Sequence, residues 1–301
     1  MPQSFRIRSR HFETLESRCV PAAAVIGAGF GGDGWDFVDG DADTQSQTNH
    51  GVEVASVFRR VAPDAALIDL KVATDDGRVR TGAIENALRW TIDHAAQRDI
   101  DVVSMSLGAG NYVDELPQWS SLFEDELAEL AQLGVVVVAS AGNSYAGAAG
   151  LAYPAASANV LAVMELGADV DGLASTSQRS DAALAAPSTK AGTSFSAPYV
   201  AAAVQKVADS LGADATREAV IDRLWATAGR TKGGYRQIDL DAALAAPREA
   251  DVAAPVIASS AERRENVAEA AELTSPDLVV ASGVGGVSTS TSTGTSASTS
   301  T

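Results

Sequence analysis

Residues 190–204 read K-A-G-T-S-F-S-A-P-Y-V-A-A-A-V, a turn that runs directly into a helix of small residues. Small hydroxyl residues are favoured at a helix N-terminus, because their oxygens accept hydrogen bonds from backbone N–H groups that the helix leaves unpaired. Proline is tolerated only in the first turn of a helix, so Pro198 fixes where this helix begins. The positive end of the helix would stabilise an alkoxide on Ser194. By itself the stretch fits an ordinary helix cap and a nucleophile site equally well, and the rest of the chain must decide between them.

Strand-like and helix-like patterns alternate on both sides of this stretch, from residue 22 to residue 246. Several of the predicted strands are continuous Val, Ile and Leu runs, which is typical of strands buried on both faces of a sheet. The predicted strands are 22–26, 35–38, 65–72, 101–106, 134–139 and 159–164. The predicted helices are 82–97, 122–133, 198–211 and 216–228. This alternation predicts a single α/β domain over residues 22–246, with a mostly parallel sheet flanked by helices.

The segments outside this domain lack its alternating pattern. Residues 1–21 carry four arginines and no apolar stretch of signal-peptide length, so we predict a basic, unstructured leader. Residues 247–276 are rich in Ala, Glu and Arg, and residues 285–301 are almost entirely Ser, Thr and Gly. Such segments cannot bury enough apolar area to offset the entropy lost on ordering, so we predict that residues 247–301 form a disordered tail.

The composition limits the partners and cofactors of the protein. A net charge of −17 argues against nucleic acids and anionic membranes as partners. The single cysteine, Cys19, rules out an internal disulfide, and no apolar run is long enough to span a bilayer. The alternating Asp39, Asp41 and Asp43 could ligate calcium, but a short run of carboxylates is more typical of a solvated loop. We therefore expect a monomer without a cofactor or a metal site.

Residues 24–32, A-V-I-G-A-G-F-G-G, match the G-x-G-x-x-G motif of dinucleotide-binding folds. In those folds a helix opens directly after the motif, so that its N-terminus holds the pyrophosphate. Here residues 33–49 are rich in turn formers and have no helical apolar stripe. We therefore do not expect a nucleotide site at this motif.

Two further segments carry residues that are typical of acyl transfer. His50 begins H-G-V-E-V-A-S-V, a helix-compatible run, and Asn143 ends V-V-V-V-A-S-A-G-N, where a buried strand runs into a turn. Each residue has an ordinary interpretation by itself, because histidine at a helix start is usually incidental and asparagine is a common turn former. A third segment, residues 103–108 (V-S-M-S-L-G), is a buried strand that ends in a loop of small residues.

Taken together and in this order, the segments resemble blocks of the subtilisin-like serine proteases, the subtilases. The family's H-G-T-H-V-A-G, N-M-S-L-G and A-A-G-N blocks are matched at residues 50–55, 104–108 and 140–143. Its Y-P-A and G-T-S-M-A-S-P blocks are matched at residues 153–155 and 192–198. The resemblance covers about residues 22–246 and implies a three-layer, subtilisin-like α/β fold with shortened loops.

The resemblance implies a serine endopeptidase that acts on peptides or proteins. Ser194 would attack the peptide carbonyl, and His50 would act as the general base. The side chain of Asn143, with the backbone N–H of Ser194, would hold the oxyanion. The residues implied to bind the substrate backbone and line its pocket are Ser106, Leu107, Gly108, Ser140, Ala141 and Gly142.

One important family position does not match. The family's first strand ends in V-I-D-S/T-G, whose aspartate orients the histidine, and this chain has V-I-G-A-G with Gly27 at that position. Three outcomes stay open: Asp33 or Asp36 supplies the carboxylate, the site works weakly as a Ser–His dyad, or the protein is a pseudoprotease that binds peptides without cutting them. Residues 10–18, R-H-F-E-T-L-E-S-R, resemble the leader of some exported bacterial surface proteins, so we expect export or a cell-surface location.

Overall fold

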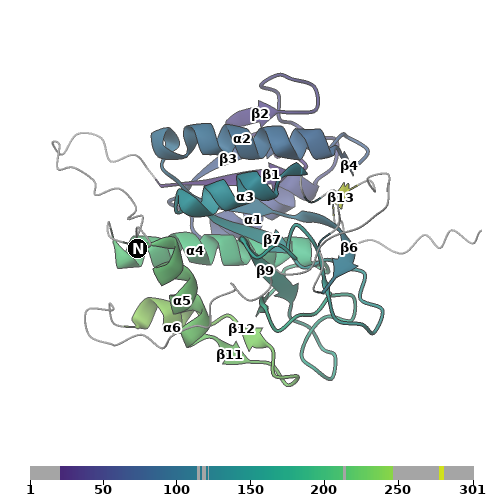
Figure 1. The fold of residues 1–301 in the computed structure, drawn as a ribbon, viewed down its shortest axis with the longest axis vertical. Helices are drawn as coiled ribbons and strands as arrows, with labels where there is room; N and C mark the ends of the chain where they lie inside the picture. Colours follow the sequence, from purple (N-terminus) through teal and green to yellow (C-terminus); the bar gives the residue numbers. More distant parts are fainter. Residues whose placement is uncertain are drawn as a thin grey trace, which may run out of the picture.

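The computed structural model describes residues 21–113, 116, 120, 122–212 and 215–246, together with the backbone of residues 278–280. Within these residues the centre is a nine-stranded sheet in the order β11-β12-β10-β9-β7-β5-β1-β3-β2 (Figure 1). Its strands are β1 (Ala22–Gly27), β2 (Gly34–Asp36), β3 (Ala66–Lys71), β5 (Ile100–Met105), β7 (Val136–Ser140), β9 (Val160–Glu165), β10 (Ala183–Ala186), β11 (Gly229–Arg230) and β12 (Arg236–Gln237). Neighbouring strands pair in parallel except β11 and β12, which confirms the expected mostly parallel α/β fold.

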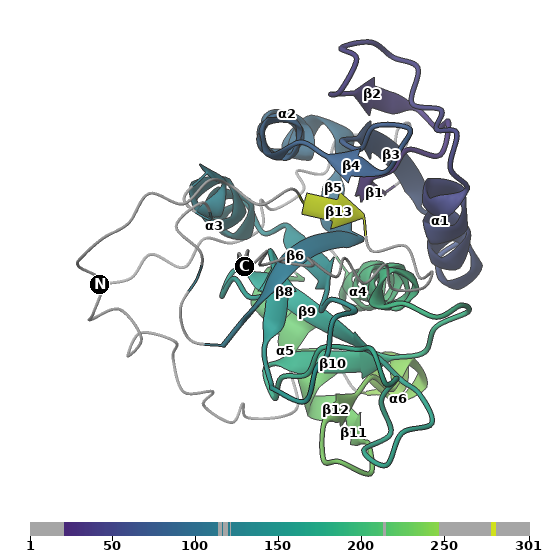
Figure 2. The same cartoon turned by 90° about the vertical axis from the view of Figure 1, so that its right-hand side faces the viewer.

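Helices cover both faces of this sheet and complete three layers (Figures 1 and 2). On one face lie α2 (Thr81–Arg98) and α3 (Glu124–Gln132), whose buried residues share a core with Ala24 and Ile26 of β1. On the other face lie α1 (His50–Val61), α4 (Ala197–Leu211), α5 (Arg217–Thr227) and α6 (Leu240–Ala245). Ala23, the β1 residue directly before Ala24, points the other way and belongs to this second core. Successive side chains of β1 therefore enter the apolar cores on opposite faces of the sheet, as expected of a strand buried on both faces.

A smaller sheet lies beside the large one and has the order β4-β13-β6-β8 (Figure 2). Its strands are β4 (Arg78–Val79), β6 (Leu107–Tyr112), β8 (Leu151–Tyr153) and β13 (Leu278–Val280). β6 begins two residues after β5 ends, so it continues outward from the carboxyl end of a central strand. The space between β4 and β6, in which β13 lies, is called the β4–β6 groove.

The carboxyl ends of β1, β5, β7 and β9 lie at one edge of the large sheet, because these strands run parallel to one another. Gly27, Ser106, Asn143 and Glu165 are therefore brought to the same edge from four separate parts of the chain. Ligand sites in open α/β sheets form at this edge, outside the carboxyl ends of the strands. The candidate site lies here.

The structure also corrects several expectations from the sequence. The strand expected over residues 35–38 is shorter and earlier, because Asp36 accepts hydrogen bonds from the backbone N–H groups of Val38 and Asp39 and the chain turns there. β4, β6, β8, β10, β11 and β12 were not predicted, since they are short or rich in Gly and Ala. Within the tail predicted over residues 247–301, Leu278–Val280 form β13. The rest of 247–301 and residues 1–20 lie outside the described residues.

Among the described helices, none has the length and apolarity needed to cross a membrane.

Candidate active site

Ser194 lies in a short 3-10 turn, Thr193–Phe195, that runs into α4. Its side chain is buried, and its backbone oxygen accepts a hydrogen bond of 2.8 Å from the Ser106 hydroxyl. The turn is entered through Gly192, whose φ of +124° is a conformation that other residues rarely adopt. α4 begins at Ala197 with Pro198 in its first turn, as the sequence predicts. The turn and helix start therefore hold Ser194 beside the end of β5.

Asn143 is fixed by Thr193, the neighbour of Ser194. The Asn143 Oδ1 atom accepts hydrogen bonds from the backbone N–H of Thr193 at 2.9 Å and from its hydroxyl at 3.0 Å. These two bonds orient the amide, because they can only be accepted by its oxygen. The Nδ2 atom is buried and has no hydrogen-bond partner in the described residues. The Nδ2 group of Asn143 therefore lies at the Ser194 turn as a hydrogen-bond donor that could bind a ligand.

His50 is the first residue of α1 and is 8% exposed. Its ring packs edge-on against Phe195, with 5.4 Å between ring centroids, and its Nε2 atom is buried without a partner in the described residues. Burial lowers the pKa of His50, and the charge of Lys190 lowers it further. Glu53 and the backbone of Ser106 act in the opposite direction but do not cancel the effect of burial on this pKa. The imidazole is therefore neutral at neutral pH, the form that can accept a proton.

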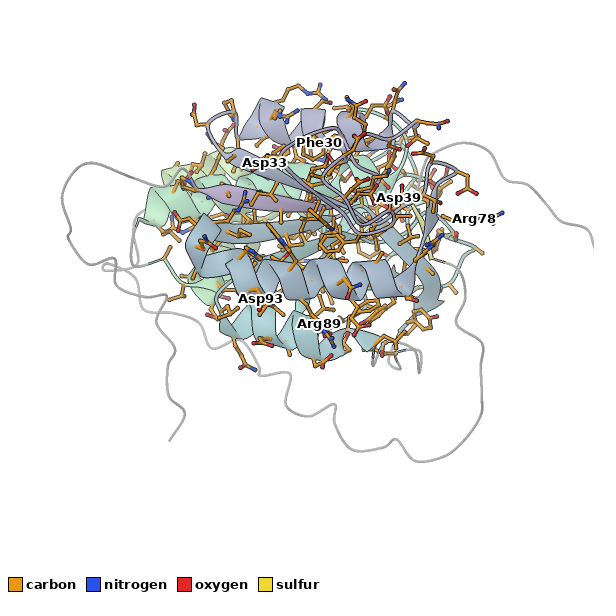
Figure 3. The ribbon with its side chains drawn as sticks, turned by 90° about the horizontal axis from the view of Figure 1, so that it is seen from above. Phe30, Asp33, Asp39, Arg78, Arg89 and Asp93 are labelled. Carbon is orange, nitrogen blue, oxygen red and sulfur yellow. The ribbon has the colours of Figure 1, made fainter. Side chains whose placement is uncertain are left out.

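Neither aspartate expected as a third member is brought to His50. Asp36 lies opposite Lys71 in the β2–β3 register, and its carboxylate is 2.8 Å from the Lys71 ammonium. Asp33 lies near Phe30 on the exposed loop after β1 (Figure 3), and its carboxylate is 2.8 Å from Arg98. Both carboxylates pair with cations on other segments, and neither forms an ion pair with His50 in the described residues. In the described part of the chain, no ion pair involves His50.

Gly27 ends β1 at the edge of the sheet where the site forms. A Cβ placed on Gly27 would meet no atom within 4 Å. Two residues later, the carbonyl oxygen of Gly29 packs against Gly51 in the first turn of α1, where a Cβ would approach it to 1.9 Å. The end of β1 therefore runs beside the helix turn that carries His50, and space for a side chain is left at Gly27.

The G-x-G-x-x-G loop uses its backbone N–H groups on a residue of the chain itself. Phe30 and Gly32 donate hydrogen bonds of 2.6 Å and 3.2 Å to the carboxylate of Asp69 in β3. Asp69 is fully buried, and burial raises its pKa while these hydrogen bonds oppose the rise. The Asp69 carboxylate thus accepts the backbone hydrogen bonds that a bound phosphate would need. The next helix, α1, starts only at His50, so no helix opens directly after the motif.

The residues expected to bind the substrate backbone line the β6 side of the site. The Ser140 hydroxyl donates a 3.4 Å hydrogen bond to the Leu107 carbonyl, and Gly142 N–H donates one of 3.2 Å to the Thr193 hydroxyl. A Cβ on Gly108 would lie 3.0 Å from the Ala152 methyl, so the small residues at this wall are needed for close packing. Ala141 is fully buried and bonded through its backbone N–H to Val163 at 2.8 Å.

Sequence reasoning missed Glu165 and the part that Thr193 plays. Glu165 ends β9, is 5% exposed, and accepts a 2.8 Å hydrogen bond from the backbone N–H of Gly192. Burial raises the pKa of this carboxyl, and the hydrogen bond from Gly192 partly opposes the rise. No local pattern indicates either role, because each depends on a partner at least 27 residues away.

Comparisons with known proteins identify a family that the chain matches. A family model described as the subtilase family matches residues 22–243. Subtilisin BL of Lederbergia lenta is 34% identical over 139 residues, which are 43% of this chain and 47% of that protein. Alkaline elastase YaB of a Bacillus strain is 31% identical over 139 residues, 43% of this chain and 33% of that protein. The chain thus spans less than half the length of these relatives.

Solved structures agree in fold. A cold adapted subtilisin-like serine proteinase has a TM-score of 0.60 and 25% identity, covering 72% of this chain and 87% of that one. A lanthipeptide protease has a TM-score of 0.62 and 17% identity, covering 75% of this chain and 86% of that one. The second likeness concerns the fold alone.

Proposed function

The chain belongs to the subtilase family, and from this membership we propose that it is a serine endopeptidase that uses Ser194, His50 and Asn143. In the proposed reaction Ser194 Oγ attacks the carbonyl carbon of a peptide bond while His50 accepts the hydroxyl proton. The C–N bond then breaks, His50 donates the proton to the leaving amine, and water hydrolyses the acyl-enzyme. Asn143 Nδ2 and the backbone N–H of Ser194 stabilise the negative oxygen of each tetrahedral intermediate.

The observation that carries the proposal is a pair of buried nitrogens, His50 Nε2 and Asn143 Nδ2, without partners in the described residues. Buried polar atoms in folded proteins are almost always hydrogen-bonded, so an unpaired one points to a ligand. Both nitrogens belong to side chains that contact the turn of Ser194, through Phe195 and Thr193. A peptide carbonyl at Ser194 would give the amide its acceptor. The imidazole would gain the serine proton.

A second candidate function is peptide binding without cleavage. It is favoured because no carboxylate forms an ion pair with His50 in the described residues: Asp33 pairs with Arg98, Asp36 with Lys71 and Glu53 with Lys190. Without a carboxylate the imidazole loses the group that fixes its tautomer and stabilises its charged form. The fold and the groove would be the same for both functions, so only chemistry at Ser194 separates them.

Labelling with a fluorophosphonate probe is the experiment that separates these two functions. The full chain should become covalently modified at Ser194, Ser194→Ala should abolish the modification, and His50→Ala should slow it. Ser196→Ala is the matched control, because Ser196 directly follows the Ser194 turn and its hydroxyl already donates to the Ala186 carbonyl at 3.1 Å. No labelling at any pH from neutral to alkaline, in a folded protein, would reject the endopeptidase in favour of the binding protein.

The proposal includes a peptide or protein substrate and an exported or cell-surface location, which the leader-like residues 10–18 support. It also describes a monomer, because a net charge of −17 opposes self-association. The nucleophile, base and oxyanion donors all come from the polypeptide, so the proposed reaction uses no cofactor. The carboxylates of Asp41 and Asp43 accept backbone N–H groups of their own loop, which supports a turn at this acidic run.

A further inference from the structure

β13 lies between β4 and β6 and pairs antiparallel with both (Figure 2). Val279 is opposite Gly108 and Val280 is opposite Leu107 on one side. Leu278 is opposite Val79 and Val279 is opposite Arg78 on the other. Gly108 and Leu107 are two of the residues expected to bind the backbone of a peptide substrate. Residues of the chain's own tail therefore occupy the position expected of a substrate strand.

The sequence of the tail accounts for this pairing. Residues 278–280, Leu-Val-Val, are a β-favouring run that lies between Pro-Asp at 276–277 and Ala-Ser-Gly at 281–283. Without β13, β4 and the facing edge of β6 would each present unpaired backbone groups. Addition of an extended peptide to such an edge is a general mode of peptide recognition, in which the main chain supplies the hydrogen bonds. The facing edges of β4 and β6 can thus pair with an extended strand between them, and residues 278–280 of the tail form that strand.

The direction of β13 leads toward the candidate nucleophile. β6 begins directly after Ser106, whose hydroxyl donates to the backbone oxygen of Ser194 at 2.8 Å. Because β13 is antiparallel to β6, it runs toward this end of β6 and ends opposite Leu107. The first peptide bonds after Val280 are therefore the ones that this register directs to Ser194.

We propose that residues 278–280 are an intramolecular ligand of the groove between β4 and β6, held in the direction and register of a substrate. The name substrate rests on the proposed function, but the binding itself needs no catalysis. Residues 247–277 link the domain to this strand and are long enough to reach any point on it. Tethering gives the strand an effective concentration on the order of millimolar. A free peptide of the same intrinsic affinity would therefore displace the strand only at millimolar concentration or above.

The same register names the bond that an active site would cut first. A substrate strand that continued the register of Val279 and Val280 by one residue would face Ser106, and this selects the bond between Ala281 and Ser282 in the sequence. Ser194 Oγ would attack the Ala281 carbonyl carbon and pass its proton through His50 to the departing nitrogen of Ser282. Water would then release the Ala281 carboxylate and restore the Ser194 hydroxyl. The tail is thus the first substrate of an active enzyme and a resident ligand of an inactive one.

A disulfide crosslink tests occupancy of the groove independently of catalysis. In the full chain carrying Cys19→Ser and Ser194→Ala, the pair Arg78→Cys and Val279→Cys places two thiols at directly opposite positions. The Arg78 side chain is 76% exposed and lies at the outer edge of the molecule (Figure 3), so the thiol is accessible. Mild oxidation should form this crosslink at least about tenfold faster than in the matched pair Arg78→Cys and Val287→Cys. Equal rates for the two pairs would overturn the proposal.

Competition by a free peptide provides a second readout. A fluorescent peptide of residues 276–283 should bind the Ser194→Ala chain about tenfold more tightly once Val279→Pro is added, because proline cannot pair within a strand that has neighbours on both sides. Val287→Pro, outside β13, should leave the affinity unchanged. The same affinity in all three proteins would contradict the proposal.

Mass spectrometry separates failure of this proposal from failure of the proposed function. The chain with native Ser194 should accumulate a fragment ending at Ala281 that is lacking in Ser194→Ala and reduced by Val279→Pro. A fast crosslink without this fragment supports the resident ligand and counts against the endopeptidase. The fragment with no preference in crosslinking would mean that the tail is cut without being held, which overturns the resident ligand.

Discussion

Three residues define the candidate site: Asn143 presents a hydrogen-bond donor, His50 presents a neutral imidazole, and Gly27 has no side chain. Thr193 fixes the Asn143 amide through two hydrogen bonds, and burial keeps the His50 imidazole neutral. Gly27 lies at the end of β1, and a Cβ there meets no atom within 4 Å. The Asn143 amide is therefore oriented at the Ser194 turn, while no carboxylate forms an ion pair with His50 in the described residues.

The substitution Gly27→Asp should add the carboxylate that His50 lacks. The side chain has room, and a carboxylate there would orient the imidazole and stabilise its charged form. We expect turnover on a peptide substrate to rise by up to about 10⁴, a magnitude known from loss of the aspartate in a subtilisin itself. Gly27→Asn is the matched control, since it has the same shape without the charge. Equal turnover in the two variants would show that a carboxylate at Gly27 does not act on His50.

The pH dependence of Ser194 labelling should report the His50 pKa. Burial lowers this pKa from its ordinary value of 6.5, and the neutral imidazole is the base. The labelling rate should therefore fall only as the pH drops through a midpoint below 6.5. Gly27→Asp should move the midpoint upward, because a nearby negative charge favours the protonated ring. A wild-type midpoint above 6.5 would contradict the burial argument.

The substitution Asn143→Ala should remove one oxyanion donor while leaving the Ser194 turn in place. Turnover should fall by about 10²–10³ with little change in KM, a magnitude known from the same substitution type in a subtilisin. Ser144→Ala, at the exposed neighbouring residue, is the control and should behave as wild type. Steady-state kinetics on one peptide checks both variants. A change in KM alone would assign Asn143 to binding.

At the scale of elements, the site is held by contacts between strand ends and turns that are far apart in sequence. Ser106 after β5 bonds to Ser194, and Glu165 at the end of β9 bonds to Gly192. Asp69 in β3 holds the loop after β1 through Phe30 and Gly32. Each of these bonds ties a loop of the site to a strand of the central sheet, so the rigid sheet sets the positions of the loops.

The substitution Glu165→Gln should stabilise the protein increasingly as the pH rises. Burial raises the Glu165 pKa in the folded state, so the folded protein holds the proton more tightly than the unfolded chain. The contribution of this carboxyl to stability is therefore full below the unfolded pKa of about 4.3 and declines as the pH rises through the folded pKa. Glutamine keeps an acceptor for Gly192 and never ionises. The Tm difference between variant and wild type should grow from pH 4 to pH 7, and a constant difference would contradict this.

For the molecule as a whole, a net charge of −17 surrounds the groove between β4 and β6, which we propose binds extended peptides. Such a field raises the encounter rate with positively charged partners, and salt screens it over a Debye length of about 10 Å at 0.1 M. The tail strand already in the groove is part of the same acidic chain and is held by its tether.

Basic peptides should therefore be cleaved faster than acidic ones at low ionic strength, and added salt should reduce this difference. At low ionic strength, kcat/KM for a peptide with added lysines should exceed that for the same peptide with added glutamates, and the ratio should shrink as salt is added. Measuring both peptides from low to high ionic strength checks this. A ratio that does not change with salt would assign any preference to direct contacts in the groove.

The fold class, the main strands and helices, and the segments that carry Ser194, His50 and Asn143 can all be predicted from the amino-acid sequence. These features depend on local patterns: continuous apolar runs, helical periodicity, and short motifs in a fixed order. These patterns can be recognised without knowing which distant residues contact each other, and so the features could be predicted from the chain alone.

The tertiary structure decided which partner each polar group takes. Asp36 pairs with Lys71 because the β2–β3 register places them opposite each other, and no local signal favours that lysine over His50. In the same way Glu165 meets Gly192, Asp69 meets the glycine loop, and Leu278–Val280 enter the groove beside Leu107 and Gly108. Such choices are made by strand register and burial between distant segments, and the folded chain alone brings those segments together.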